Sequence, residues 1–409
     1  MVQPQPSPSM APRSVLALGG YLVLITALVR LGTSLYLPAL PRMGLEMQLS
    51  APLLSSTMTA YLAAFAGASI FLGPVSDRWG RQILIRGGIA VFLLGSVFCA
   101  VANGIAYLLA GRVCQAIGGA AVQVAARAMS RDAFDDHQMI RVVGWIGVIT
   151  GLVPILAPVL GGFITQGWGW RANFYLLIGA TLLVGVGTHK FSAETLSHGN
   201  RPSLGIAQTL RAYAAMLGAA SFLVPLLPVM LCFAAQGAYL VGSPFIFIHL
   251  LGLSPAVFGA TSLLPVASLL TGRFLCLAIL KRRGDFPAFV TGGLLAFVGG
   301  FLFWLENRMG WNSAAPLLMA CSVFCLGFGA VLPIGMKAGL SAFPRYVGTS
   351  SALFGCLTLG ATAVGSSAVG HWLQQTERDI TTLATFTLLC GGLAFSTSLL
   401  YRRSQSKRT

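Results

Sequence analysis

The sequence has few charged residues, and acidic residues are the scarcest of them. Of its 409 residues, 9% are Asp, Glu, Lys or Arg, and ten acidic residues face 26 basic ones, for a formal net charge of +16. Soluble domains carry about 25% charged residues, so the composition excludes a soluble protein. The basic residues lie between long apolar runs rather than on one solvated face, so we expect no nucleic-acid partner.

Sequence motifs of enzymes and metal sites are missing as well. The eight cysteines all fall within apolar runs and none forms a C-x-x-C pair, which argues against a disulfide framework and a metal site. H-E-x-x-H, G-x-S-x-G and P-loop sequences do not occur, which argues against a membrane-embedded enzyme and against ATP as the direct energy source. We therefore expect no cofactor, no metal and no enzymatic activity.

Long apolar runs, in contrast, are abundant, since 56% of the residues are hydrophobic. Each run is long enough to cross a bilayer, which takes about 20 apolar residues, and too evenly apolar for a barrel strand. The runs lie at residues 15–37, 51–72, 83–102, 105–126, 142–164, 170–188, 221–248, 259–280, 286–305, 314–337, 348–373 and 382–401. The predicted fold class is all-α and integral to the membrane, with twelve transmembrane helices.

The longest polar interval, near residues 189–214, divides these runs into two sets of six. Two six-helix halves indicate a duplicated transporter with its site between the halves, near the midplane. With both termini in the cytoplasm, the basic residues of the outer loops are Arg42, Arg171, Arg308 and Arg378, and most others lie on the cytoplasmic side. The expected parts are a cytoplasmic tail (1–14), a six-helix bundle (15–188), a cytoplasmic central loop (189–220), a second bundle (221–401) and a basic cytoplasmic tail (402–409).

The loop after the second run, residues 73–81, reads GPVSDRWGR. Asp77 can accept hydrogen bonds from helix N-termini or from an arginine, and Gly80 permits a tight turn, so we interpret the loop as a latch that holds one access state closed. It resembles the G-x-x-x-D-R-x-G-R loop of the major facilitator superfamily, and residues 281–285 (KRRGD) repeat it weakly after the eighth run. An ordinary basic loop is the alternative. The predicted gating residues are Gly73, Asp77, Arg78, Gly80 and Arg81.

Two further motifs resemble those of drug:proton antiporters in this superfamily. Residues 112–118 (RVCQAIG) are similar to the R-x-x-Q-x-x-G helix, and residues 154–162 (PILAPVLGG) to the Gly/Pro-rich signature, although Ala157 replaces the usual glycine. Proline bends a helix, and paired glycines allow close helix contact. A snorkelling arginine and a generic kinked helix are the alternatives. The predicted antiporter-type residues are Pro154, Pro158, Gly161 and Gly162.

Three short segments are similar to the Bcr/CflA branch of drug efflux proteins: residues 36–41 (YLPALP), 170–174 (WRANF) and 242–245 (GSPF). The resemblance covers nearly the whole chain and is weaker in the second half. It implies a monomeric, multi-pass inner-membrane transporter of the major facilitator fold that exports a small organic compound by alternating access, coupled to protons. A dedicated exporter of a siderophore or another organic anion is the alternative.

The chain departs from this branch in its intramembrane charges. The branch carries an Asp two residues before Tyr-Leu-Pro, where this chain has Ser34, and all ten acidic residues fall in predicted loops or at span ends. Arg30 and Arg112 each lie roughly 10 Å inside the outer edge, at 1.5 Å per helical residue. A charge at this depth is costly and indicates function. We expect both guanidiniums to hold an anionic group of the substrate in the central cavity; snorkelling outward is the alternative.

The remaining candidates for substrate contact are polar residues on predicted cavity helices. Gln236 and Tyr239 share a helix face, and they are equally compatible with polar contacts between helices. Lys337 lies near the inner end of its run, from where it can instead reach the cytoplasm. The predicted substrate-binding residues are Arg30, Ser34, Arg112, Gln115, Gln236, Tyr239 and Lys337. None of the five histidines lies at mid-membrane, so the proton carrier stays unassigned.

Overall fold

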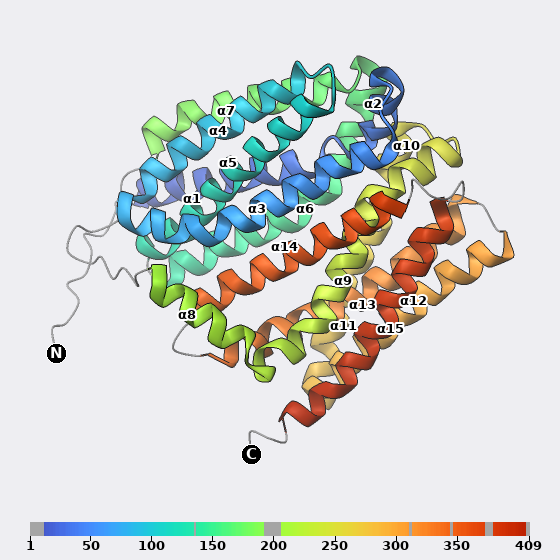
Figure 1. The fold of residues 1–409 in the computed structure, drawn as a ribbon. Coiled ribbons are helices and arrows are strands. Elements are labelled where there is room, and N and C mark those ends of the chain that lie inside the picture. Colours follow the sequence, from blue (N-terminus) through green and yellow to red (C-terminus); the bar gives the residue numbers. More distant parts are fainter. Residues whose placement is uncertain are drawn as a thin grey trace.

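The structure is a computed structural model that describes residues 12–134, 136–191, 206–310, 313–343, 347–372 and 379–405. Within these ranges the regular elements are all helices (Figure 1). The first half comprises α1 (Pro12–Ser34), η1 (Leu37–Ala39), α2 (Leu40–Met47), α3 (Ala51–Trp79), α4 (Arg81–Ala100), α5 (Ile105–Asp132), α6 (Asp136–Trp168) and α7 (Arg171–Phe191). The second half comprises α8 (Ile206–Leu217), α9 (Ala220–Pro244), η2 (Phe245–Leu250), α10 (Pro255–Thr261), α11 (Leu263–Arg283), α12 (Asp285–Met309), α13 (Ala314–Ser341), α14 (Val347–Trp372) and α15 (Asp379–Gln405).

Twelve stretches of the described residues are long and apolar enough to cross a membrane, which confirms the predicted number. Three of them combine several elements. The first, Ala17–Met47, contains α1, η1 and α2; the seventh, Ala220–Leu250, contains α9 and the π-helical η2; the eighth, Pro255–Arg283, contains α10 and α11. The shorter α8 lies within the segment expected as the central loop.

Close contact between two helices at a glycine occurs in both halves. In the first half α4 and α5 approach so closely at Gly95 that an added Cβ would overlap the backbone of Gly111 and Gln115. In the second half α12 and α13 do the same at Gly299, where a Cβ would overlap the backbone of Phe324. Small residues let transmembrane helices pack backbone to backbone, which gains van der Waals contact that lipid cannot replace. The occurrence of this glycine contact at equivalent helices of both halves agrees with a duplicated architecture.

The two halves touch mainly through two pairs of helices, α3 with α14 and α6 with α10. The start of α1, the end of α15 and α8 lie on one side, here called the termini side, whereas α2 and α10 lie on the opposite, distal side (Figure 1). Helix α6 packs closely against α10 but hardly against α11, so this contact is confined to the distal side. Helices α3 and α14 also pack together, and the hydroxyls of Thr59 and Ser366 lie 2.9 Å apart across that interface.

Candidate functional site

A cavity of about 210 Å³ lies between the two halves. Its lining comes from α1, α3 and α6 of the first half and mainly from α9, α11 and α13 of the second. The polar lining consists of Arg30, Thr33, Ser34, Gln236, Tyr239, Ser243, Ser262, Thr362 and Thr387. The aromatic lining beside Tyr239 consists of Phe233, Phe258, Phe303, Phe324 and Phe328, all from the second half. The cavity therefore has a cationic wall on α1 and an aromatic wall opposite.

Arg30 is the one charged residue among the described residues that line this cavity. Its Nε is buried without a hydrogen-bond partner in the described part of the chain. Ser34 lies one helical turn further along α1 and also lines the cavity, and Gln236 and Tyr239 face it from α9. The Tyr239 hydroxyl is buried too, and makes no hydrogen bond of acceptable geometry with the described residues. Four of the seven predicted substrate-binding residues thus surround one space.

Arg112 lies in a different place, enclosed within the first half. Its guanidinium carbon sits 4.2 Å from the ring centroids of both Tyr36 and Tyr61, so the cation lies between two aromatic faces. Nη1 donates hydrogen bonds to the Gly32 carbonyl at 2.8 Å and to Gln115 Oε1 at 2.7 Å. The side chain is fully buried, and it reaches neither the cavity nor the membrane surface.

Gln115 completes this buried network rather than lining the cavity. Its Nε2 donates to Ser96 Oγ at 2.8 Å, which connects α5 to α4. Because Arg112 binds the carbonyl of Gly32, the network also connects α5 to α1, two residues from Arg30. Arg30 and Arg112 therefore do not share one cavity, in contrast to the expectation from the sequence. Arg112 and Gln115 instead fix α1, the helix that carries Arg30.

Charged pairs join helix ends on the termini side of both halves. In the first half Arg81 Nε donates to Asp132 Oδ2 at 3.0 Å, joining the start of α4 to the end of α5. In the second half Lys337 Nζ lies 2.9 Å from Asp285 Oδ2, joining the end of α13 to the start of α12. The two ion pairs occupy corresponding positions with the signs of their charges exchanged. Lys337, predicted to bind substrate, does not line the cavity.

The predicted gating loop forms the turn between α3 and α4. Gly80 has a φ of +103°, a left-handed value that glycine adopts without a steric penalty, and Gly284 repeats this turn with a φ of +86° before α12. Arg81 Nη1 also donates to Ser76 Oγ at 2.9 Å, so the turn is held to the end of α3. Arg78 is exposed, a Cβ at Gly73 would meet open space, and the Asp77 side chain lies outside the described residues.

The antiporter-type motif lies where α6 contacts both halves. Pro154 and Pro158 line the cavity. At Gly161 an added Cβ would overlap the carbonyl oxygen of Leu35, and at Gly162 it would overlap the carbonyl oxygen of Pro255. Helix α6 is thus held against Leu35, directly after α1, on one face and against α10 on the other, which explains why both positions carry glycine.

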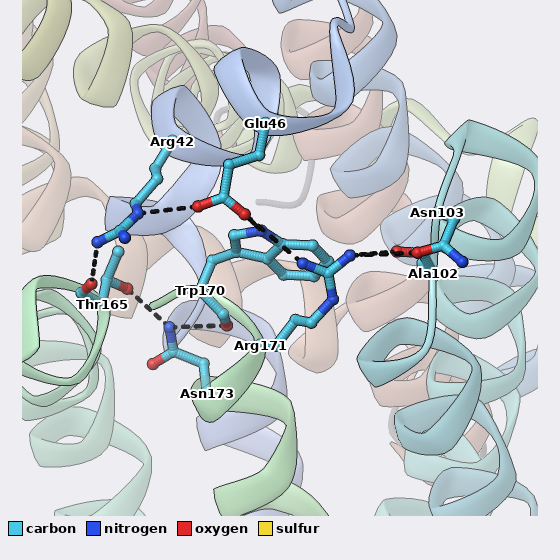
Figure 2. Close-up of polar contacts among 8 residues, drawn as sticks. All are labelled: Arg42, Glu46, Ala102, Asn103, Thr165, Trp170, Arg171 and Asn173. Atoms are coloured by element: carbon cyan, nitrogen blue, oxygen red, sulfur yellow. Dashed lines mark hydrogen bonds and ion pairs between the residues drawn. The ribbon is translucent and has the colours of Figure 1, made fainter. Parts of the chain in front are cut away.

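A polar network fixes the distal end of α6 (Figure 2). Glu46 on α2 accepts hydrogen bonds from Arg42 Nε at 3.0 Å and from Trp170 Nε1 at 2.7 Å, and it lies 3.5 Å from Arg171 Nη1. Arg42 Nη1 also donates to the Thr165 carbonyl at 2.8 Å, in the last turn of α6. The network connects α2, α6 and α7, and it gives the WRANF segment a structural role that sequence similarity alone did not define.

Three polar residues that sequence analysis did not single out lie close to the cavity. Gln123 and Arg127 lie one turn apart on α5, and Gln123 is within hydrogen-bond distance of Arg30. Glu306 lies inside the ninth span, Asp285–Met309, and its Oε2 is buried without a partner among the described residues. Glu306 lies in the last turn of α12, which agrees with the expectation that this acidic residue lies at a span end.

Comparison with curated proteins identifies relatives along most of the chain. Multidrug resistance protein D of Escherichia coli (strain K12) is 27% identical over 377 residues, which cover 90% of this chain and 93% of that protein. Multidrug resistance protein MdtL of Escherichia coli O81 (strain ED1a) is 28% identical over 359 residues, which cover 86% and 88%. These relatives are transporters, not enzymes, and they support a multi-pass protein of the inner membrane.

Solved structures and a family profile agree on the fold. A bacterial homolog of the human lysosomal transporter Spinster, in an inward-facing and unoccupied conformation, superposes with a TM-score of 0.76 at 16% identity, covering 96% of this chain and 99% of that chain. A D-xylose-proton symporter gives a TM-score of 0.73 at 16% identity, covering 94% and 97%. The profile described as Major Facilitator Superfamily matches residues 22–366. The chain is therefore a transporter that belongs to the major facilitator superfamily.

Proposed function

We propose that this transporter exports a small organic compound across the inner membrane by alternating access, as a Bcr/CflA-type efflux protein. The observation that carries the proposal is the cavity between the halves, with one cationic and one aromatic wall. A site between two six-helix repeats can be exposed to either side when one repeat rocks against the other. The relatives named multidrug resistance proteins support efflux as the direction of transport.

The distribution of charge supports a cytoplasmic termini side. Exposed basic residues in cytoplasmic loops set the orientation of a multi-pass protein, and the exposed run 281–283 lies on the termini side. On the distal side Arg42 and Arg171 are both paired with Glu46. With this orientation, the distal contact of α6 with α10 closes the outer side, and the cavity faces the cytoplasm, where an exporter collects its substrate.

The predicted site residues take different roles in this proposal. Arg30, Ser34, Gln236 and Tyr239 contact the substrate, since they surround the cavity. Arg112 and Gln115 position α1. Lys337 pairs with Asp285 and holds helix ends together on the termini side of the second half. The gating residues have the same role in the first half: Gly73, Asp77, Arg78, Gly80 and Arg81. Of the antiporter-type residues, Gly161 and Gly162 form the distal closure, and Pro154 and Pro158 line the cavity.

Proton coupling needs a group that gains and loses a proton, which a guanidinium does not do in proteins. Glu306 is our candidate, because its Oε2 is buried without a partner in the described residues. Phe303, one turn earlier on the same face of α12, lines the cavity, so the carboxylate lies one turn from it toward the distal side. Ser34, at the position of the branch's carboxylate, cannot take this role.

Export of a dedicated organic anion is the second candidate, favoured by Arg30 as the cavity's one charged residue among those described. A drug-susceptibility panel separates the two candidates. Small shifts for many unrelated drugs after deletion indicate a multidrug exporter, whereas accumulation of one anionic metabolite indicates a dedicated one.

Transport into proteoliposomes with an imposed pH gradient tests the proposal as a whole. We expect gradient-dependent movement of at least one compound of the panel, and we expect a protonophore to abolish it. If no compound moves in response to a pH gradient or a voltage, the protein is not a secondary active exporter of this kind.

A further inference from the structure

A buried glutamine, Gln123, lies between two arginines, of which one, Arg30, lines the cavity. The hydrogen-bond network assigns the Gln123 amide orientation in which Oε1 accepts from Arg30 Nη2 at 3.1 Å and from Arg127 Nη2 at 3.3 Å. Gln123 is buried, whereas Arg127 is exposed. Two positive groups thus share one neutral oxygen inside a transmembrane bundle.

This arrangement leaves the charge of Arg30 poorly compensated. A guanidinium stays protonated even when buried, and no carboxylate among the described residues forms an ion pair with Arg30. An amide oxygen offers a partial charge, whereas an anion forms hydrogen bonds about twice as strong with guanidinium groups. The unpartnered Nε of Arg30 offers a further donor to such an anion.

The three residues follow one another from the end of α5 on the termini side toward the cavity, although Gln123 and Arg127 themselves do not line it. Arg127 lies in the second-to-last turn of α5, near its end on the termini side, and Gln123 lies one turn further in. Arg30, which contacts Gln123, lines the cavity itself. An anionic group can therefore be attracted by the exposed Arg127 and then bound by the buried Arg30.

We propose that Arg30, Gln123 and Arg127 form a binding site for the anionic group of an amphipathic organic anion, whose apolar part lies against the aromatic wall of the second half. This inference rests on the proposed function, because it assigns the substrate class of the same cavity. The aromatic wall contributes no charge, and the hydroxyl and amide groups between the walls can bind polar atoms along the ligand. A strong anion, such as a sulfonate or carboxylate, suits the two guanidinium groups.

Two related dyes test the site. Anilinonaphthalene sulfonate (ANS) carries one sulfonate, and N-phenylnaphthylamine (NPN) has the same aromatic frame without it. Fluorescence titration of the full chain in phosphatidylcholine nanodiscs, corrected with empty nanodiscs, gives both dissociation constants. We expect Arg30→Gln to weaken ANS binding about tenfold and Arg127→Gln about threefold, with NPN binding unchanged within about twofold.

Gln123→Glu is the decisive variant, because it places a carboxylate between the guanidiniums without a change in side-chain size. We expect it to weaken ANS binding about tenfold while NPN binding and thermal stability are kept, since the new carboxylate occupies the anion site. Gln48→Glu is the matched control, with the same change in net charge at an exposed position on the distal side. It should leave both dyes unaffected.

Two results overturn the inference. One is unchanged ANS binding in Arg30→Gln and Gln123→Glu. The other is loss of ANS binding when phosphatidylglycerol replaces part of the phosphatidylcholine, which would assign the site to a lipid headgroup. Failure of the proposed function is a separate result: the wild-type protein would bind ANS through Arg30 yet transport no compound of the panel, ANS and NPN included.

Discussion

Arg112 shows how a buried arginine can be held without an acid, although its Nε and Nη2 find no hydrogen-bond partner among the described residues. Its charge lies between Tyr36 and Tyr61, and its Nη1 is bound by a carbonyl and an amide oxygen. A planar guanidinium can stack on two rings and donate in its own plane at the same time, which an ammonium cannot do. The shape of Arg112 therefore matters as much as its charge.

Replacement of Arg112 by lysine separates these two properties. We expect Arg112→Lys to keep the charge, to lose the stacking and one hydrogen bond, and to lower the apparent melting temperature by several degrees, because a hydrogen bond to a charged group contributes about 1.5–3 kcal/mol. Thermal unfolding followed by size-exclusion chromatography measures the shift. The exposed Arg78→Lys should have no effect. A wild-type melting temperature in Arg112→Lys would show that the network has no structural role.

At the same scale, sequence reasoning singled out Arg30, which lines the cavity, and missed its neighbours Gln123 and Arg127. Counting residues places Arg30 and Arg112 at similar depth, but it does not tell which face of a helix turns toward the cavity. Gln123 has no sequence feature that separates it from an ordinary polar contact between helices. Arg127 near a helix end is indistinguishable from the basic residues that set orientation. Only packing of α1 against α5 brings the three together.

At the scale of elements, apolar length predicted the number of spans because a bilayer fixes the length of a helix that crosses it. It did not predict how spans are interrupted. The first span continues past the run ending at residue 37, through η1 and α2, until Gln48 adopts a left-handed φ of +53°. Helix α8 was missed because twelve residues are too few for a span and its segment is polar at one end.

The close contact of α6 with α10 predicts a conformational effect. In Gly162→Val the side chain would overlap the Pro255 carbonyl, so the distal side cannot close as it does here. We expect a population shift toward the outward-open state and loss of transport. Spin labels at the exposed positions Leu45 and Val257, in a cysteine-free background, report the change as a longer distance.

Gly20→Val is the control for this variant, because a Cβ at Gly20 meets no atom within 4 Å. It should keep both transport and the wild-type distance. If Gly162→Val also kept the wild-type distance distribution, the α6–α10 contact would not be the closure of the distal side.

The ion pair between Lys337 and Asp285, which joins α13 to α12, gives a second prediction at the scale of elements. Lys337→Asp would place two carboxylates together at the ends of α12 and α13, and we expect it to reduce transport several-fold. The double variant Asp285→Lys with Lys337→Asp restores the attraction and should recover at least about half of the activity, because a partly exposed pair depends on charge more than on shape. Initial rates in proteoliposomes at equal protein content measure both. No recovery in the double variant would show that the pair does not act through its charges.

At the scale of the whole molecule, the two halves are alike in packing and unlike in chemistry. Both use glycine contacts between equivalent helices and a charged pair at equivalent helix ends. The first half supplies the cation of the cavity, and the second half supplies its aromatic wall and the partly buried Glu306. Our proposal thus assigns substrate charge and proton exchange to different halves, so coupling between them would require the halves to move relative to each other.

Glu306→Gln tests this division of roles. The amide keeps the size of the side chain but cannot exchange a proton, so transport driven by a pH gradient should fall at least about tenfold, while exchange of substrate across the membrane without a gradient should continue. Counterflow and gradient-driven uptake in the same proteoliposomes give the ratio. Glu46→Gln, which removes a carboxylate already paired with Arg42 and Trp170 on the same side, should lower both rates equally or leave them unchanged. Full gradient-driven uptake in Glu306→Gln would place the coupling group elsewhere in the chain, whereas loss of both reactions would assign Glu306 to the movement of the halves rather than to the proton.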